Sequence, residues 1–183
     1  MPIKFDLGEY LTDIFIETGI GDGGNIIKAM RAGFADIHGI DASPVLHAAA
    51  NERVAHEMGR LPWRTNVMLY CGDPVAGLHQ VCGTAHHKRA TILLDSRDGG
   101  DGAPRPLFDE IRVLRHWFGD GLILPVIMVG GIRQAPGQAS PPPLGPVIDA
   151  LLDLCDEYQF RILADDTSRN ILAALPPTLP RTR

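Results

Sequence analysis

The fold is decided by residues 13–41, which read DIFIETGIGDGGNIIKAMRAGFADIHGID. The stretch opens with a short apolar run, residues 13–18, that is typical of a buried strand, and it continues into a turn rich in glycine. Residues 25–32 then repeat apolar side chains at a helical period, and residues 35–40 form a second strand that ends at Asp41. Strand, glycine turn, helix and strand together make the repeating unit of a parallel α/β sheet.

The rest of the chain continues this alternation. Ser43 is suited to cap a helix that has Pro44 at its first position. We expect the apolar residues of this helix to face inward: Val45, Leu46, Ala49, Ala50 and Val54. Further strands are expected at residues 66–71, 90–94, 122–129, 160–164 and 170–175, and further helices at 74–81, 106–118 and 147–156. The pattern predicts an α/β fold with a mostly parallel sheet and helices on both faces. No helix separates the last two strands, which predicts that one of them is antiparallel.

Length and composition favour one globular domain. The chain has 183 residues, of which 45% are hydrophobic. Such a length leaves little room for the separate cofactor and substrate domains of a two-domain dehydrogenase. We expect an N-terminal segment at residues 1–12, the domain at residues 13–177 and a flexible tail at residues 178–183.

Charge and cysteine content exclude several classes of protein. The net charge of −5 disfavours nonspecific binding of nucleic acid, and three scattered cysteines do not make a disulfide framework. The N-terminus lacks the order of a signal peptide. The longest apolar run, residues 122–129, contains Pro125 and is far shorter than the ~20 residues that span a membrane. We therefore expect a cytoplasmic protein that does not bind membranes.

Candidate ligand-binding residues follow the strands. In open parallel sheets, ligands bind at the carboxyl ends of the strands. Gly19, Gly21 and Gly23 come directly after the first long strand, and Asp41 ends the next strand, about 20 residues further on. Glycine lets the backbone approach a ligand, and an acid at the next strand accepts hydrogen bonds from ribose hydroxyls. The pattern predicts a nucleoside-type ligand, and taken alone it also fits a dinucleotide site.

Four stretches of the sequence carry a resemblance to a known family. They are residues 15–41, YCGDP at 70–74, ATILLDSRDGGDGAPRPLFDEI at 90–111 and RNILAALPP at 169–177, and together they run over most of the chain. In these stretches the chain resembles the class I S-adenosylmethionine-dependent methyltransferases, and among them a group of small bacterial and phage-type proteins. The resemblance implies a Rossmann-like, three-layer, doubly wound, seven-stranded sheet whose last strand is antiparallel.

The resemblance also implies S-adenosylmethionine as the cofactor and a role for each motif residue. By that resemblance, Glu17, Thr18, Gly19 and Gly21 surround the methionine part, with Gly23 completing the turn, Asp41 holds the ribose, and Gly72 and Asp73 border the adenine.

Two positions depart from the family. Relatives commonly carry further acids after the fourth and fifth strands, and some use them to hold a divalent cation. Here residues 95–97 read Asp-Ser-Arg and residues 129–133 read Val-Gly-Gly-Ile-Arg. A hard cation needs several oxygen ligands, and Arg97 would repel it, so we expect no catalytic metal. We do not expect Asp98 and Asp101 to rescue such a site.

Asp95 and Arg97 are the candidate catalytic residues. Asp95 is placed to act as a base or to orient the substrate, or else it caps the following loop or pairs with Arg97. Arg97 and Arg133 suit an acidic group of a substrate, or else they are solvated or pair with nearby acids.

Three functions remain open. We favour methyl transfer to a small-molecule or sugar-like acceptor, at oxygen and without a metal. The first alternative is a methyltransferase-like binding or assembly protein that has lost catalysis, because Gly130 and Gly131 replace the usual acids. The second, weaker alternative is a nicotinamide-binding Rossmann domain. Since the chain has few inserts and its first dozen residues offer only a thin lid, a second copy or a partner subunit is a further expectation.

Overall fold

The computed structural model describes residues 3–62, 64–95, 106–132, 142–164 and 170–177. Its elements follow the order β1 (Ile3–Lys4), the 3-10 helix η1 (Leu7–Tyr10), β2 (Ile14–Thr18), α1 (Gly24–Ala32), β3 (Asp36–Asp41), α2 (Pro44–Met58), β4 (Asn66–Cys71), α3 (Pro74–Ala85), β5 (Ala90–Leu94), α4 (Leu107–Phe118), β6 (Val126–Val129), α5 (Leu144–Leu152), β7 (Gln159–Ala164) and β8 (Asn170–Leu175). Every strand and helix expected from the sequence is present, and β1 and η1 are additional.

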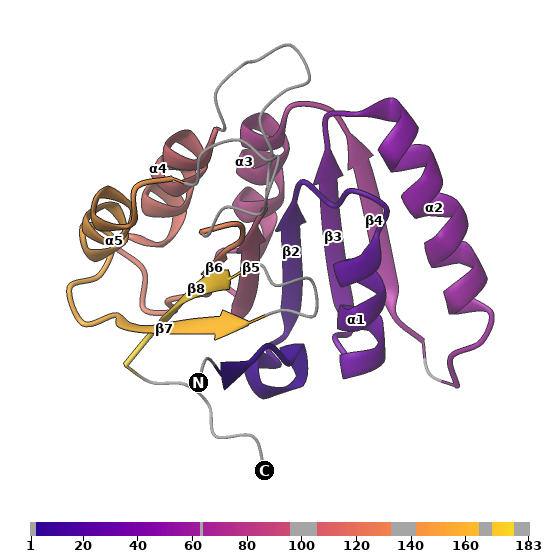
Figure 1. Cartoon of the computed structure of the whole chain (residues 1–183), viewed down its shortest axis with the longest axis horizontal. Coiled ribbons are helices and arrows are strands. Elements are labelled where there is room, and N and C mark those ends of the chain that lie inside the picture. The colour runs from indigo at the N-terminus through magenta and orange to yellow at the C-terminus, as the bar shows by residue number, and fades with distance from the viewer. Residues whose placement is uncertain (1–2, 63, 96–105, 133–141, 165–169, 178–183) are drawn as a thin grey trace.

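The strands form one mixed sheet in the order β1-β7-β8-β6-β5-β2-β3-β4 (Figure 1). β8 runs antiparallel to both of its neighbours, β6 and β7, whereas every other pair is parallel. The predicted seven-stranded sheet with an antiparallel last strand is therefore confirmed, and β1 adds a two-residue strand at one edge.

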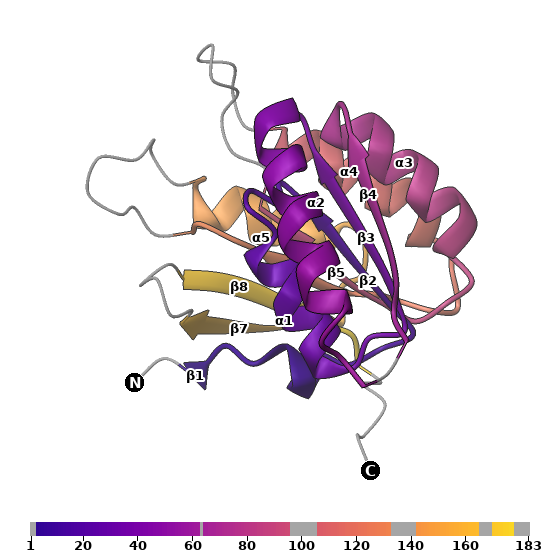
Figure 2. The same ribbon diagram turned by 90° about the vertical axis from the view of Figure 1, so that its right-hand side faces the viewer.

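Helices cover both faces of this sheet and enclose two apolar cores. On one face α1 and α2 pack over the strands with η1, and on the other face α3, α4 and α5 do so (Figure 2). Successive residues of a strand point to opposite faces, so the odd-numbered residues of β2, β3 and β5 face α1 and the even-numbered ones face α3. The three-layer, doubly wound arrangement is confirmed.

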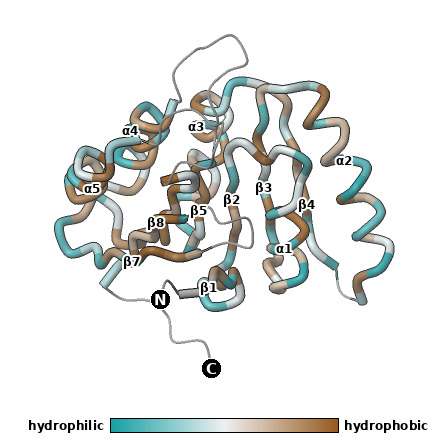
Figure 3. The backbone as a smooth tube through the Cα atoms, in the orientation of Figure 1, coloured by the Kyte–Doolittle hydropathy of each residue, from teal (hydrophilic) through white to brown (hydrophobic). Residues whose placement is uncertain are grey.

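Hydrophobic residues concentrate in the middle layer. They lie along β6, β7 and β8, whereas α2 carries many hydrophilic side chains (Figure 3). Within the part of the chain that the structure describes, no helix combines the length and the apolar character needed to cross a membrane.

The inward face of α2 differs from the expected one. Ala50 and Val54 are buried, but Val45 is 77% exposed and Leu46 is 41% exposed, so the prediction for these two residues is wrong. Val45 lies off the helical stripe that contains Ala50 and Val54. Leu46 lies on that stripe, one turn before its first buried residue, where it is no longer covered.

β6 is shorter than the expected strand at residues 122–129. It begins only at Val126, and Leu122 is fully exposed. Pro125 has no backbone N–H to give to the sheet, and its carbonyl instead accepts a hydrogen bond from Tyr158 Oη at 2.8 Å. The sequence pattern overestimated this strand because the apolar run continues through a residue that cannot pair.

Gly39 in the middle of β3 sets how closely the glycine turn packs on the sheet. A Cβ atom at Gly39 would lie 2.8 Å from Ile20 Cγ2, 2.8 Å from Leu69 Cδ2 and 3.1 Å from Ile26 Cδ1. These contacts come from the turn, from β4 and from α1. A side chain at this position would therefore push the turn away from the strand ends.

We predict that Gly39→Ala destabilises the protein by about 1–3 kcal/mol, the usual cost of overpacking a core. Gly145→Ala is the matched control, because a Cβ there meets no atom within 4 Å and the residue lies in α5. The control should be neutral or up to about 1 kcal/mol more stable, since alanine favours helices. Urea unfolding of the two variants checks this, and equal stability would contradict the packing described above.

Candidate functional site

The site is built at the point where the strand order reverses. The chain runs from β2 outward to β3 and β4 on one side, and then from β5 to β6 on the other, so β2 and β5 are neighbours at a switch point. The carboxyl ends of strands at such a point border the crevice where open α/β sheets bind ligands. β2 ends there at Thr18 and β5 at Leu94.

The turn after β2 depends on glycine. Gly19, Gly21 and Gly23 have φ angles of 73°, 55° and 81°, which side chains disfavour. The Gly19 amide donates to Ile40 O at 2.8 Å, and this hydrogen bond ties the start of the turn to β3. The turn thus brings backbone, without side chains at these three positions, to the edge of the crevice, and α1 begins at Gly24.

Asp41 holds this turn in place. Its Oδ2 accepts a hydrogen bond from Gly21 N at 2.9 Å, and its Oδ1 accepts one from Ser43 N at 2.8 Å. The side chain is only 6% exposed. The structure therefore brings the predicted acid together with the predicted glycines, and it shows that the carboxylate also shapes the turn.

Glu17 is a buried acid beside this turn. It is 1% exposed, and its Oε1 accepts a hydrogen bond from Asn25 Nδ2 at 2.8 Å. Its Oε2 is buried and has no hydrogen-bond partner among the described residues. Burial raises the pKa of Glu17 well above its ordinary value, the hydrogen bond from Asn25 lowers it, and Asp95 and Asp41 add to the rise.

The register of the sheet explains why these three acids interact. Glu17 lies opposite Gly39 of β3 and opposite Leu93 of β5. Asp41 and Asp95 each come two residues later, so all three carboxyl groups lie on the α1 face of the sheet. This corner of the site is therefore suited to a cationic group, which would pair with Glu17 Oε2 and relieve the repulsion.

Thr18 lies on the other face. It is fully buried opposite Leu94, and its Oγ1 has no hydrogen-bond partner among the described residues. Its carbonyl accepts a hydrogen bond from Asp95 N at 3.0 Å, which holds the end of β5 against β2. The structure thus separates the side chains of Thr18 and Glu17, although the sequence grouped them.

Gly72 and Asp73 lie at the same edge of the sheet, after β4. Gly72 N donates to Asp41 O at 2.9 Å, and the Asp73 side chain caps α3 by accepting from Ala76 N at 2.7 Å. Both residues are exposed, and a Cβ at Gly72 would meet no atom within 4 Å. Their expected place beside an adenine remains a prediction.

Asp95 packs against Gly130. A Cβ atom at Gly130 would clash with Asp95 Oδ1 and lie 2.9 Å from Asp95 Cγ. Any side chain at position 130 would therefore displace the Asp95 side chain, which gives a steric reason for glycine at this position. The other residues expected in this part of the site, Arg97, Asp98, Asp101 and Arg133, lie outside the described residues. Among the described residues, no group of three or more His, Cys, Asp or Glu side chains is arranged to hold a metal ion.

The N-terminal segment does not cover the site. Tyr10 O accepts a hydrogen bond from Thr91 Oγ1 at 2.6 Å, near the first residue of β5. Residues 7–12 therefore pack at the amino ends of the strands, opposite the crevice, and the expected thin lid is wrong for this part of the chain.

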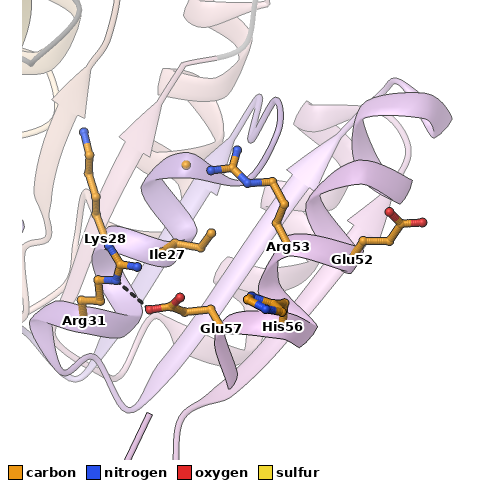
Figure 4. A pocket seen from close by; sticks show the side chains of 8 residues that line it. Ile27, Lys28, Arg31, Glu52, Arg53, His56 and Glu57 are labelled. Carbon is orange, nitrogen blue, oxygen red and sulfur yellow. Dashed lines mark hydrogen bonds and ion pairs between the residues drawn. The ribbon is translucent and has the colours of Figure 1, made fainter. Parts of the chain in front are cut away.

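A separate groove lies between α1 and α2 and has a volume of about 540 Å³ (Figure 4). Its two arginines are paired with acids: Arg31 Nε lies 2.7 Å from Glu57 Oε1, and Arg53 forms an ion pair with Asp22. Lys28 Nζ lies 5.9 Å from the centre of the Phe5 ring. Because both arginines are already paired with acids, we do not assign a ligand to this groove.

Sequence reasoning missed two site residues, Asn25 and Asp22. Asn25 was assigned only to the helix, and Asp22 only to the glycine turn. No local signal identifies the partner of Asn25, because its hydrogen bond to Glu17 joins two different elements, α1 and β2. For Asp22, which accepts a hydrogen bond from Gly24 N at 3.2 Å, only the structure shows the direction of the side chain.

Comparison with known proteins identifies the fold. No protein-family model matches the sequence, and no curated protein is significantly similar to it. A putative methyltransferase from Streptococcus mutans, solved in complex with SAH (S-adenosylhomocysteine), is 12% identical with a TM-score of 0.56, over 92% of this chain and 93% of that one. Human methyltransferase-like protein 13, also solved with SAH, is 13% identical with a TM-score of 0.58, over 96% and 78% of the two chains.

A third similar structure is an O-methyltransferase family protein from Burkholderia thailandensis. It is 12% identical with a TM-score of 0.58, and the match covers 96% of this chain but 55% of the other. At these identities the likeness establishes the architecture: the chain has the Rossmann-like fold of the class I methyltransferases, as the sequence predicted.

The buried Glu17 predicts a stability gain when its charge is removed. A carboxyl group whose pKa is raised on folding favours the folded state below its ordinary pKa of 4.5, and this contribution is lost as the pH rises through the higher folded pKa. Glu17→Gln keeps an oxygen for Asn25 and removes the charge. We expect the variant to be more stable than the wild type at pH 8, by about 1–3 kcal/mol, with the difference shrinking toward pH 5. Denaturant unfolding across this range is the measurement, and a difference that does not depend on pH would contradict the assignment.

Proposed function

We propose that this protein is an S-adenosylmethionine-dependent methyltransferase that acts on a small-molecule or sugar-like acceptor, at oxygen and without a metal. One observation carries the proposal: Glu17 is a buried carboxyl group beside the glycine turn at the switch point of the sheet, and its Oε2 has no hydrogen-bond partner among the described residues. The two similar structures solved with SAH support it, because they share this architecture.

The residues of the site fit this cofactor. Its methionine part carries an ammonium group, which suits the unpartnered oxygen of Glu17 and the neighbouring acids Asp41 and Asp95. Gly19 and Gly21 let the backbone approach the ligand. Asp41 would hold the ribose from its place against Gly21, and Gly72 and Asp73 would border the adenine.

An acid of the glycine turn also argues against a nicotinamide dinucleotide. The pyrophosphate of such a cofactor binds at the N-terminus of the helix after the glycine turn. Here the Asp22 carboxylate already accepts from Gly24 N at 3.2 Å, at the first residue of α1. A carboxylate at this helix end repels a phosphate group. The electrostatics therefore favour a ligand that is cationic at this end.

When bound, S-adenosylmethionine supplies an electrophilic methyl group on a sulfonium. An oxygen acceptor must lose a proton. We propose that Asp95 takes this proton or orients the acceptor, since its backbone N–H donates a hydrogen bond to Thr18 O and so holds the residue at the end of β5. A hard divalent cation would need several oxygen ligands. Gly130 supplies no carboxylate beside Asp95, which supports a reaction without a metal.

The acceptor is proposed to be small because little of the chain is left over for recognising it. The strands and helices, together with the short connections between most of them, account for most of the 183 residues. The two longest connections follow β5 after Leu94 and β6 after Val129, at the edge where the crevice lies. We propose that these connections, with a second copy or a partner subunit, complete the acceptor site.

The alternative, a protein that has lost catalysis, rests on the glycines that stand at positions 130 and 131 in place of acids. The contact between Gly130 and Asp95 gives the glycine at position 130 a packing role instead. Methyl transfer to any small hydroxylated acceptor, lowered at least about tenfold in Asp95→Ala, is the expected result, and a variant with full turnover would remove Asp95 from the mechanism.

The proposal predicts saturable binding of SAH, measured by calorimetry. Asp41→Asn should weaken this binding at least about tenfold, because an amide cannot accept hydrogen bonds through its nitrogen and so loses one of the two bonds to Gly21 N and Ser43 N. The matched control is Asp149→Asn, at an exposed position of α5, which should bind as the wild type does.

Two outcomes would contradict the proposal. A wild-type protein that binds neither SAH nor S-adenosylmethionine cannot be the proposed enzyme. Saturable binding of the reduced nicotinamide cofactor, followed by its fluorescence, would favour the dinucleotide alternative instead.

A further inference from the structure

Asn25 has a side chain whose position the helix itself does not explain. Asparagine is a poor helix former, yet it stands in the first turn of α1. The N-cap of this helix is Gly23, which makes no side-chain capping bond, so Asn25 does not cap the helix. Its amide instead donates to Glu17 Oε1 at 2.8 Å, across the glycine turn.

The surroundings of Glu17 give this hydrogen bond its importance. The residues beside Glu17 on the neighbouring strands are Gly39 and Leu93, which offer no polar side chain. The Asn25 amide is the one side-chain donor that the described residues direct at Glu17. With one oxygen held by an N–H donor, Oε2 is the oxygen left for another partner.

Charged groups from every neighbouring element act on Glu17. Asp41 after β3 and Asp95 after β5 disfavour its ionised form, whereas Lys28 of α1 favours it. Burial has the largest effect and also disfavours the charge, and the Asn25 amide opposes burial by stabilising the carboxylate. Without a cation at the site, the protonated form of Glu17 is therefore favoured over a wider pH range than for a free glutamate.

We propose that Asn25 is a positioning residue of the cofactor site: it fixes one oxygen of Glu17 and so directs the other toward the cofactor's ammonium group, whose binding displaces the Glu17 proton. This inference rests on the proposed function and adds to it a coupling between cofactor binding and proton release. The proton passes from the Glu17 carboxyl group to solvent, and the carboxylate that remains pairs with the ammonium group, so the charge balances.

The coupling can be measured on the wild-type protein. Calorimetry of SAH binding at pH 6, in two buffers with different heats of ionisation, should give a release of up to about one proton per bound ligand. The affinity should rise with pH between pH 5 and 7.5 and then level off, because Glu17 must be ionised in the complex. Binding without proton release and without this rise would overturn the proposal.

The role of Asn25 is tested with Asn25→Ala. Alanine favours the helix, so the fold should persist, which circular dichroism checks. The variant should bind SAH about tenfold more weakly at pH 6.5. The pH at which its affinity stops rising should be higher than in the wild type, because the amide that stabilises the Glu17 carboxylate is gone. Asn51→Ala is the matched control, because Asn51 is exposed in α2 and, among the described residues, its side chain hydrogen-bonds to His47 of the same helix. The control should match the wild type at every pH.

A cofactor-free measurement separates the two proposals. The Glu17→Gln substitution changes the free energy of unfolding by an amount that depends on pH, because only Glu17 ionises. When the same substitution is made in the Asn25→Ala protein, this pH dependence should lie at higher pH. The inference fails and the proposed function stands if the wild type binds SAH but Asn25→Ala shifts neither the pH dependence of SAH affinity nor that of the unfolding free energy. If the wild type does not bind SAH, the proposed function fails and the inference fails with it, even where the cofactor-free profile shifts.

Discussion

The structure depends on a carboxyl group placed where a carboxylate is costly. Glu17 lies one residue before the end of β2, a strand that is buried along its whole length. Its side chain is on the face that α1 covers, and the residues opposite it on both neighbouring strands offer no polar side chain. An ionised group that is buried with only one hydrogen bond lowers the stability of the folded protein. Groups of this kind are common at binding sites, where a ligand of opposite charge offsets their unfavourable burial, and we propose that a cationic ligand does so here.

The other features of the site follow from the geometry around that carboxyl group. The parallel register places Asp41 and Asp95 two residues beyond the neighbours of Glu17, on the same face. Asp41 fixes the glycine turn through its two backbone hydrogen bonds, and Gly39 lets the turn pack closely on the sheet. Asp95 occupies the space that Gly130 leaves. One sheet edge thus collects acidic side chains at the switch point, and we propose that this arrangement suits a cationic ligand better than a pyrophosphate.

The order of strands and helices could be predicted because it depends on local patterns. The apolar run before the glycine turn, Ser43 with Pro44 before α2, and the missing helix between β7 and β8 each leave a signal within a few residues. The predicted strand was too long where the apolar pattern continued through Pro125, which cannot pair in the sheet. The predicted burial of Val45 and Leu46 was wrong because the start of α2 extends past the residues that pack on the core. The hydrogen bond from Asn25 to Glu17 and the contact between Asp95 and Gly130 join residues on different elements, so only packing in three dimensions reveals them.

The central claim is that Glu17 is buried in order to hold the cationic end of a cofactor. The most direct measurement is a crystal structure of the protein with bound S-adenosylhomocysteine. The account predicts that the ligand's amino group lies within about 2.7–3.2 Å of Glu17 Oε2 while Asn25 keeps its hydrogen bond to Oε1. A ligand bound elsewhere, or one that leaves Glu17 Oε2 without a partner, would contradict it.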